Sequence, residues 1–382
     1  MLMESRVFLD SFTLAWEQRK FIPNNTLSRA ELNYESGSVR NIHYGDILIK
    51  YGSVVDVQND EIPFATGKSS DDFKGALLQD GDIIIADTAE DETTGKACEI
   101  GNSQGLDVVS GLHTMVCRPR DKMALGYLGY YLNSDAYHHQ LLPLMQGIKV
   151  LSLSRTNVQK TMVCYPKSNA EQQLIADCFR NLDNLITLHQ RKYDKLVNVK
   201  KSMLEKMFPR DGKNVPEIRF SGFTEAWEQR KVSDMFKITR GNVLPVTMTA
   251  ESQSDEKPYP VYSSQTKEQG LMGYYKEYLF EDAITWTTDG ANAGTVNYRS
   301  GKFYCTNVCG VLLSDNNKAN QMVSEALNRV SKSYVSYVGN PKLMNNVMAD
   351  IEIKVPCSSI EQEKIGKYFE QLDHLITLHQ CK

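Results

Sequence analysis

Two polar loops carry side chains that suit contact with a nucleic acid. Their candidate contact residues are Lys149, Ser152, Ser154 and Arg155 in residues 146–155, and Lys342, Asn345 and Asn346 in residues 339–346. Lysine and arginine contact phosphates, while arginine and asparagine can read guanine and adenine edges with paired hydrogen bonds. A polar loop by itself is usually a solvated turn. Here both loops precede a last predicted strand and then a long predicted helix, and this equivalent placement favours DNA binding.

Further candidates lie in two loops that follow predicted strands, 88–96 and 287–294, and in residues 263–265. These are Thr88, Lys96, Ser263, Ser264, Gln265, Thr288 and Asn292. The predicted strands cover residues 80–87, a segment that ends near 116–117, residues 278–286, and further strands within 302–313. Short helices are predicted at about 125–141 and 319–331. Each polar loop is thus expected on a small α/β module.

Motifs for catalysis or metal binding are weak. Residues 65–69, ATGKS, have the end of a phosphate-binding loop, but Ile62 stands where that motif requires glycine. The eight cysteines show no CxxC pair and no zinc-ligand spacing, so we expect reduced thiols. Cys305 and Cys309 are expected to be strand residues on the same face of a sheet. The Asn/Asp-Pro-Pro-aromatic motif of amino-methyltransferases is missing as well.

The elements that must hold these loops are revealed by an internal repeat. Residues 12–20, FTLAWEQRK, return as 223–231, FTEAWEQRK. Residues 171–190 return as 361–380, and both copies contain LITLHQ. The segments between the copies share little sequence. Near-identical frames around unlike inserts favour one scaffold that carries two recognition modules over a tandem duplication with drift, which would spread its changes evenly.

The second repeat predicts two long helices. Between residues 171 and 207 there is no glycine or proline, and apolar residues alternate at spacings of four and three, as in a helix that packs along another helix. The second copy, 361–382, is shorter, and we expect an antiparallel pair. The predicted interface residues are Trp16, Trp227, Phe179, Leu182, Ile186, His189, Phe369, Leu372, Ile376 and His379. The two histidines are expected to have polar neighbours rather than a ligand.

The repeat also sets the predicted domain boundaries. They are a flank at 1–20, the first module at 21–165, a long helix at 166–208, a linker and second flank at 209–231, the second module at 232–355 and a shortened helix at 356–382. The chain has 382 residues and a net charge of -4, which does not advertise a nucleic-acid binder but does not exclude a local basic surface. No apolar run is long enough to span a membrane and no signal peptide is evident, so a cytoplasmic protein is expected.

The duplicated FTxAWEQRK and LITLHQ segments, each pair enclosing a divergent module, resemble the specificity subunit (HsdS) of type I restriction-modification systems. Residues 42–46, 87–96 and 111–113 resemble one type of its target-recognition domain, and residues 260–264 and 270–274 resemble another. The resemblance implies an α/β fold with two target-recognition domains, an antiparallel coiled coil and a pseudo-two-fold repeat.

The same resemblance implies a non-enzymatic subunit in which each module reads one half of a split site in double-stranded DNA. It implies two methyltransferase subunits and restriction subunits as partners, and these would bring S-adenosylmethionine, ATP and Mg²⁺, so that this chain binds no cofactor. The terminal helix lacks a counterpart to residues 193–209. The alternatives are a self-sufficient DNA-modifying enzyme, disfavoured by the missing motifs, and a structural coiled-coil adaptor, which would not need two unlike modules.

Overall fold

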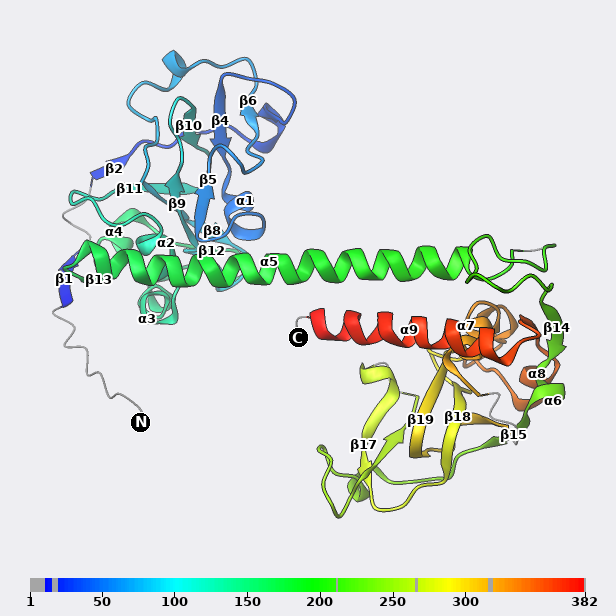
Figure 1. The fold of residues 1–382 in the computed structure, drawn as a ribbon. Helices are drawn as coiled ribbons and strands as arrows, with labels where there is room; N and C mark the ends of the chain where they lie inside the picture. The colour runs from blue at the N-terminus through cyan, green and yellow to red at the C-terminus, as the bar shows by residue number, and fades with distance from the viewer. Residues whose placement is uncertain (1–10, 16–19, 211, 265–266, 315–318, 381–382) are drawn as a thin grey trace. The chain divides into compact units, whose positions relative to one another are not determined.

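The computed structural model describes residues 11–15, 20–210, 212–264, 267–314 and 319–380, and the chain divides into two compact units, 1–186 and 187–382. The boundary falls inside α5 (Asn169–Lys206), one uninterrupted helix that contributes to both units. Figure 1 shows this helix as the longest element of the chain. None of the helices in the described ranges is long and apolar enough to cross a membrane.

The first unit is built on mixed sheets. One has the strand order β2-β11-β7-β9-β5 and another β10-β4-β6-β3, while β1 pairs with β13 and β12 pairs with β8. The strands are β1 (Ser11–Ala15), β2 (Lys20–Ile22), β3 (Leu32–Asn33), β4 (Val39–Ile42), β5 (Val54–Asp56), β6 (Phe64–Ala65), β7 (Ile83–Ala86), β8 (Thr88–Ala89), β9 (Ala97–Gly101), β10 (Asp107–Ser110), β11 (Thr114–Arg118), β12 (Leu151–Ser152) and β13 (Met162–Pro166). The hydrophobic run of β7 is buried on both faces, as expected of a central strand.

Short helices cover these sheets. They are η2 (Arg29–Glu31), α1 (Tyr44–Ile49), η3 (Ser70–Phe73), α2 (Tyr127–Leu132), α3 (Asp135–His138), η4 (Leu142–Leu144) and α4 (Arg155–Val158). The prediction of a single helix over 125–141 is therefore wrong, because the helix is interrupted between α2 and α3. At the break Asn133 turns its amide to the sheet, where Oδ1 accepts from Ala97 N at 3.0 Å and Nδ2 donates to Ala97 O at 2.7 Å. A side chain that bonds to a distant backbone in this way favours the end of a helix.

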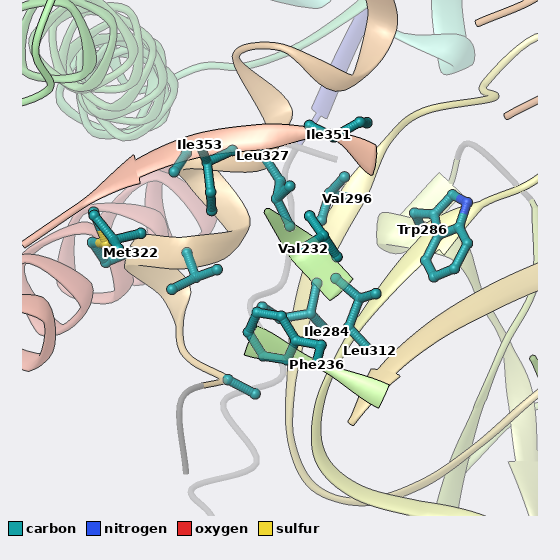
Figure 2. Packing of buried hydrophobic residues seen from close by; sticks show 14 of the residues in the cluster. Val232, Phe236, Ile284, Trp286, Val296, Leu312, Met322, Leu327, Ile351 and Ile353 are labelled. Atoms are coloured by element: carbon teal, nitrogen blue, oxygen red, sulfur yellow. The ribbon is translucent and has the colours of Figure 1, made fainter. Parts of the chain in front are cut away.

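The second unit has one larger sheet with the order β15-β20-β18-β19-β16-β17, and β14 pairs separately with β21. Its strands are β14 (Glu228–Lys231), β15 (Lys237–Arg240), β16 (Tyr259–Tyr262), β17 (Leu271–Tyr275), β18 (Phe280–Thr287), β19 (Val296–Cys305), β20 (Cys309–Leu313) and β21 (Glu352–Val355). Its helices are α6 (Val232–Met235), η5 (Val246–Met248), η6 (Lys267–Gly270), α7 (Gln321–Asn328), η7 (Ser331–Tyr334), α8 (Asn345–Asp350) and α9 (Ser359–His379). Figure 2 shows side chains from the sheet, α7 and β21 meeting in a single core, with Ile284, Leu327 and Ile353 among them.

Cys305 and Cys309 are strand residues of the six-stranded sheet, as predicted, and they lie on two different strands. Cys305 ends β19 and Cys309 begins β20, with a turn between them. Both thiols are buried in the same hydrophobic cluster. The described cysteines form no disulfide.

Within the second unit α9 packs antiparallel to the C-terminal half of α5. Lys200 of α5 lies opposite Asp373 of α9, whereas the earlier residue His189 lies opposite the later residue His379. Leu196, Val199, Met203 and Leu204 pack on a core that contains Ile365, Phe369 and Leu372. Apolar burial along this seam is what holds a helix pair of this kind together.

The repeated Glu-Gln pair holds the start of each long helix. Gln172 Nε2 donates to Pro166 O at 2.7 Å, and Gln362 Nε2 donates to Pro356 O at 2.8 Å. Glu361 is buried and accepts two hydrogen bonds from Arg219, at 2.6 and 2.8 Å. The near-verbatim sequence of the frame thus corresponds to a shared way of joining a strand to a helix.

Candidate nucleic-acid interface

Each module presents a short hairpin closed by the same pair of backbone hydrogen bonds. In the first unit Gln146 and Ser152 exchange bonds of 3.0 and 2.8 Å, and in the second Ser336 and Lys342 exchange bonds of 2.8 and 2.9 Å. Residues 146 and 152 are displaced from 336 and 342 by 190 positions, which is the displacement that relates the long helices. The hairpins, residues 146–152 and 336–342, are therefore equivalent features of two modules that share little sequence.

Both hairpins are anchored on the loop that follows a central strand. Leu153 N donates to Asp87 O at 2.8 Å, and Leu343 N donates to Thr288 O at 2.9 Å. In the second unit Gly290 N also donates to Pro341 O at 3.0 Å. The loops predicted at 88–96 and 287–294 thus lie beside the hairpins, which brings two of the predicted contact segments together in each module.

A matching asparagine supports the far end of each loop. Asn328, which ends α7, accepts from Val296 N at 2.8 Å and donates to Val296 O at 2.6 Å, as Asn133 does with Ala97. Sequence reasoning missed both residues. The signal that could have found them is an asparagine at the end of a short helix in each module, but its partner is distant in the chain.

The predicted contact residues of the first module differ in how far their side chains are engaged within the module, and even the exposed Ser152 donates from its hydroxyl to Gln146 O at 3.3 Å. Lys149 and Ser152 are exposed on the hairpin and Thr88 is half-buried beside it. The Oγ of Ser154 accepts from Asn157 N at 3.2 Å, so this side chain caps the N-terminus of α4. Arg155 is exposed, and its Nη2 donates to Asn24 Oδ1 at 2.9 Å.

Lys96 is turned into the module. Its Nζ donates to Leu48 O at 3.0 Å and to Tyr51 O at 3.2 Å, and burial lowers its pKa. The ammonium therefore holds α1 against the sheet instead of facing solvent. Of its neighbours in the 88–96 loop, Glu90, Asp91 and Glu92 are exposed. Such carboxylates repel phosphates but can accept a hydrogen bond from the cytosine amino group.

In the second module Lys342 and Asn346 are exposed and Asn345 begins α8. Lys342 Nζ lies 3.7 Å from Asp289 Oδ1. Thr288 is buried, with its hydroxyl 2.8 Å from Asp289 Oδ2 and 3.0 Å from Val308 O, so it shapes the loop instead of facing solvent. Gln265 lies outside the described residues.

Ser263, Ser264 and Asn292 lie close to one another in the second module. Asn292 Nδ2 donates to Ser264 O at 3.3 Å, and Ser263 and Asn292 line a cavity of about 270 Å³. Arg299 also lines this cavity, and sequence reasoning missed it. Its buried guanidinium lies 3.6 Å from the centre of the Tyr262 ring, and burial lowers its pKa. Of the predicted contact residues in the second module, Ser263 and Asn292 thus line this cavity, whereas Lys342 and Asn346 are exposed.

The predicted helix-pair residues also divide. Phe369 and Leu372 are buried, Ile376 is half-buried, and Trp227 packs edge-on against Phe208 at 5.7 Å between ring centres. Trp16 lies outside the described residues. Phe179, Leu182 and Ile186 are exposed.

The two repeated histidines lie against each other in the second unit. Their Nδ1 atoms are 2.9 Å apart, which requires one nitrogen to donate and the other to accept. The pKa of His379 is lowered, first by desolvation and then by nearby positive charge. Among the described residues, no cluster of three His, Cys, Asp or Glu side chains is arranged to hold a metal ion.

The profile described as "Type I restriction modification DNA specificity domain" matches residues 32–198 and 224–382. A putative type I specificity subunit of Mycoplasma pneumoniae is 38% identical over 139 residues, which cover 36% of this chain and 72% of that protein. The type I restriction enzyme MpnII specificity subunit of the same organism is 37% identical over 143 residues, 37% of this chain and 42% of that protein. The crystal structure of a type I restriction-modification S subunit from M. genitalium aligns over 99% of this chain and 93% of that chain, with a TM-score of 0.68 and 13% identity.

Proposed function

Because the chain belongs to the family of type I restriction-modification DNA specificity domains, we propose that it is the DNA-reading subunit of a type I restriction-modification complex. Each module reads one half of a split site in double-stranded DNA. The observation that carries this proposal is the recurrence of the hairpin and its anchoring loop, 146–152 on 88–96 and 336–342 on 287–294, in two modules of unlike sequence. The same hairpin backbone with different side chains is what the reading of two different half-site sequences requires.

The chemistry of the two hairpins supports this assignment. Lys149 and Lys342 supply exposed positive charge, and Ser152, Asn346 and Arg155 supply hydrogen-bonding groups that can reach base edges or phosphates. Because the net charge of the chain is -4, the attraction to DNA must come from local positive charge. The positive surface of partner subunits adds to it.

We assign the catalytic steps to partners. Two methyltransferase subunits dock on the helical frame and bring S-adenosylmethionine, and restriction subunits bring ATP and Mg²⁺, while this chain, in the cytoplasm, binds no cofactor and performs no reaction. The frame suits docking because its sequence is nearly identical in both copies, so that two identical subunits can meet equivalent surfaces.

A module exchange tests the proposal. The chain is expressed with the methyltransferase subunits of its own operon, and the methylated bases are mapped. Replacement of residues 21–165 by the corresponding module of another family member should change one half of the methylated sequence and leave the other half unchanged. The reciprocal exchange of residues 232–355 should change only the second half.

The two outcomes that contradict the proposal differ. If both halves of the site change after one exchange, the modules do not read separately. If methylation is the same in cells that lack this chain, it is not the specificity subunit. A self-sufficient DNA-modifying enzyme is tested by binding of labelled S-adenosylmethionine, which should require the methyltransferase subunits and not occur with the purified chain.

A further inference from the structure

The tip of each hairpin carries an aliphatic side chain that is exposed to an unusual degree. Ile148 is 100% exposed and Val338 is 92% exposed. Among the exposed large hydrophobic side chains of the described residues these two have the highest values. Each lies two positions after the first residue of the closing pair, Gln146 and Ser336, so the tips occupy the same place in unlike modules.

Both tips are held in a defined shape. Gly147 has a φ of 128°, and a Cβ there would lie 1.9 Å from Val150 O; Gly339 in the second hairpin has a φ of 78°. Both values favour glycine, so the backbone beside each tip is specified. Isoleucine and valine are branched at Cβ and have few side-chain rotamers, so little conformational entropy is lost when either is buried.

The surroundings of each tip indicate what covers it. Lys149 follows Ile148 directly, and Lys342 closes the hairpin that carries Val338. An aliphatic group flanked by positive charge fits a partner with anionic rims around an apolar interior. Duplex DNA has this arrangement, with phosphates beside grooves whose floors present thymine methyl groups and base-pair edges.

We propose that Ile148 and Val338 enter a groove of the DNA, each within its own half-site, and bury their aliphatic groups against base-pair edges. This inference rests on the proposed function. The two tips would then be specificity-determining contacts. An aliphatic side chain gains binding free energy beside a thymine methyl group or at a base step that deforms easily, and it gains none beside a polar base edge that it leaves without a hydrogen bond.

The test uses the complex of the chain with its methyltransferase subunits and duplexes that carry the mapped site. Ile148→Ala should raise the dissociation constant for the site by up to about sixtyfold, and Val338→Ala by up to about fifteenfold, in line with the three and the two methyl or methylene groups that these changes withdraw from an apolar contact. Affinity for a random duplex and its salt dependence should stay the same, because neither variant alters a charge.

The penalty should belong to one half-site in each case. On a duplex whose first half-site is scrambled, one of the two tip variants should lower the affinity no further, while the other keeps its full effect. The variant that loses its effect identifies the tip that contacts the scrambled half-site. Ile49→Ala and Val243→Ala are the matched controls, since these aliphatic side chains are 88% and 74% exposed and belong to segments of the chain outside the hairpins. Both controls should bind as the wild type does.

Three results would overturn the inference. They are unchanged affinity of both tip variants, an equal loss on specific and random duplexes, and a loss of methyltransferase binding in size-exclusion chromatography with no change in DNA affinity. Failure of the proposed function is distinct from all three, because the wild-type complex would then show no preference for a split site.

Discussion

Glu99 lies on β9 with its carboxylate buried against the start of α2. Its Oε2 accepts a hydrogen bond from Gly129 N at 3.0 Å. Burial raises its pKa to about 7, and the backbone N–H groups of α2 and the charge of Arg180 oppose that shift only in part. The side chain therefore joins β9 to the segment that ends at Asn133, and it does so at the cost of burying a charge when it ionises.

This burial predicts a pH dependence of the first unit. The pKa in the folded protein lies above the value of about 4.3 in an unfolded chain, so the folded form binds the extra proton and the contribution of Glu99 to stability is lost as pH rises through about 7. Glu99→Gln keeps an acceptor for Gly129 N without a charge. The free energy of unfolding of this variant should equal that of the wild type near pH 4.5 and exceed it by ~1 to 3 kcal/mol at pH 8.

The measurement is the free energy of local opening from hydrogen exchange of β9 amides at several pH values. Glu90→Gln, on an exposed residue of the same module, is the control and should leave the pH profile as it is. If the difference in opening free energy between Glu99→Gln and the wild type were the same at pH 4.5 and pH 8, the Glu99 carboxyl group would not be the source of the pH dependence.

Which side chains face solvent was predictable only in part at the residue scale. Lys149 and Lys342 are exposed because they lie on short surface hairpins, a local property. Lys96 and Thr288 bond instead to Tyr51 O and Val308 O. Those partners are set by how distant segments pack, so the sequence around each residue holds no sign of them.

At the scale of elements, the long helices follow the sequence closely, since α5 and α9 begin and end within three residues of the predicted bounds. Periodicity identifies an apolar face but does not name its partner. Phe179 and Leu182 repeat the spacing of Phe369 and Leu372, yet only the second pair is buried in the helix seam. Phe179 instead stacks on Tyr130 at 5.3 Å between ring centres.

Lys200 is the polar centre of the helix pair in the second unit. Its Nζ lies 2.7 Å from Asp373 Oδ1 on α9 and 2.8 Å from Glu325 Oε1 on α7. Burial lowers its pKa, but the two carboxylates, Glu325 foremost, outweigh burial and the net shift is upward. One ammonium thus ties α5 to two other helices.

We expect Lys200→Met to destabilise the second unit by ~2 to 4 kcal/mol, because it leaves two carboxylates facing each other without their cation. The change should appear in urea unfolding monitored through Trp227 and Trp286, which both lie in the core of this unit. Lys201→Met replaces an exposed neighbour and should have almost no effect. Adding Glu325→Leu to Lys200→Met should recover part of the loss, and a double variant less stable than the single one would contradict this account.

At the scale of the whole molecule, α5 is the one helix that contributes residues to both units. The repeated segments fix where each module begins and ends along the chain, and their recurrence was visible in the sequence. The contents of the modules were less predictable. Two unlike sequences reach the same hairpin through backbone hydrogen bonds, which leave little trace in residue type.

A continuous helix between two reading modules predicts that helix length sets the distance between half-sites. The repeated length, residues 361–382, corresponds to about 33 Å at 1.5 Å per residue. This is close to the ~34 to 36 Å of one DNA turn, so we expect half-site centres about ten base pairs apart. Insertion of four residues after Asn198 would add about 6 Å to α5. It also separates His189 from Lys200 by a further turn and so breaks their common register with His379 and Asp373.

The insertion should therefore lengthen the non-specific spacer between the half-sites by one or two base pairs, or abolish methylation. The base sequence of both half-sites should stay the same. Methylation mapping in cells that carry the variant measures both quantities at once. Four residues inserted after Gly105, in an exposed turn of the first module, serve as the control and should keep the spacer. Full activity with the original spacer after the α5 insertion would show that the helix does not set the distance. A change in either half-site would show that α5 also shapes the reading surfaces.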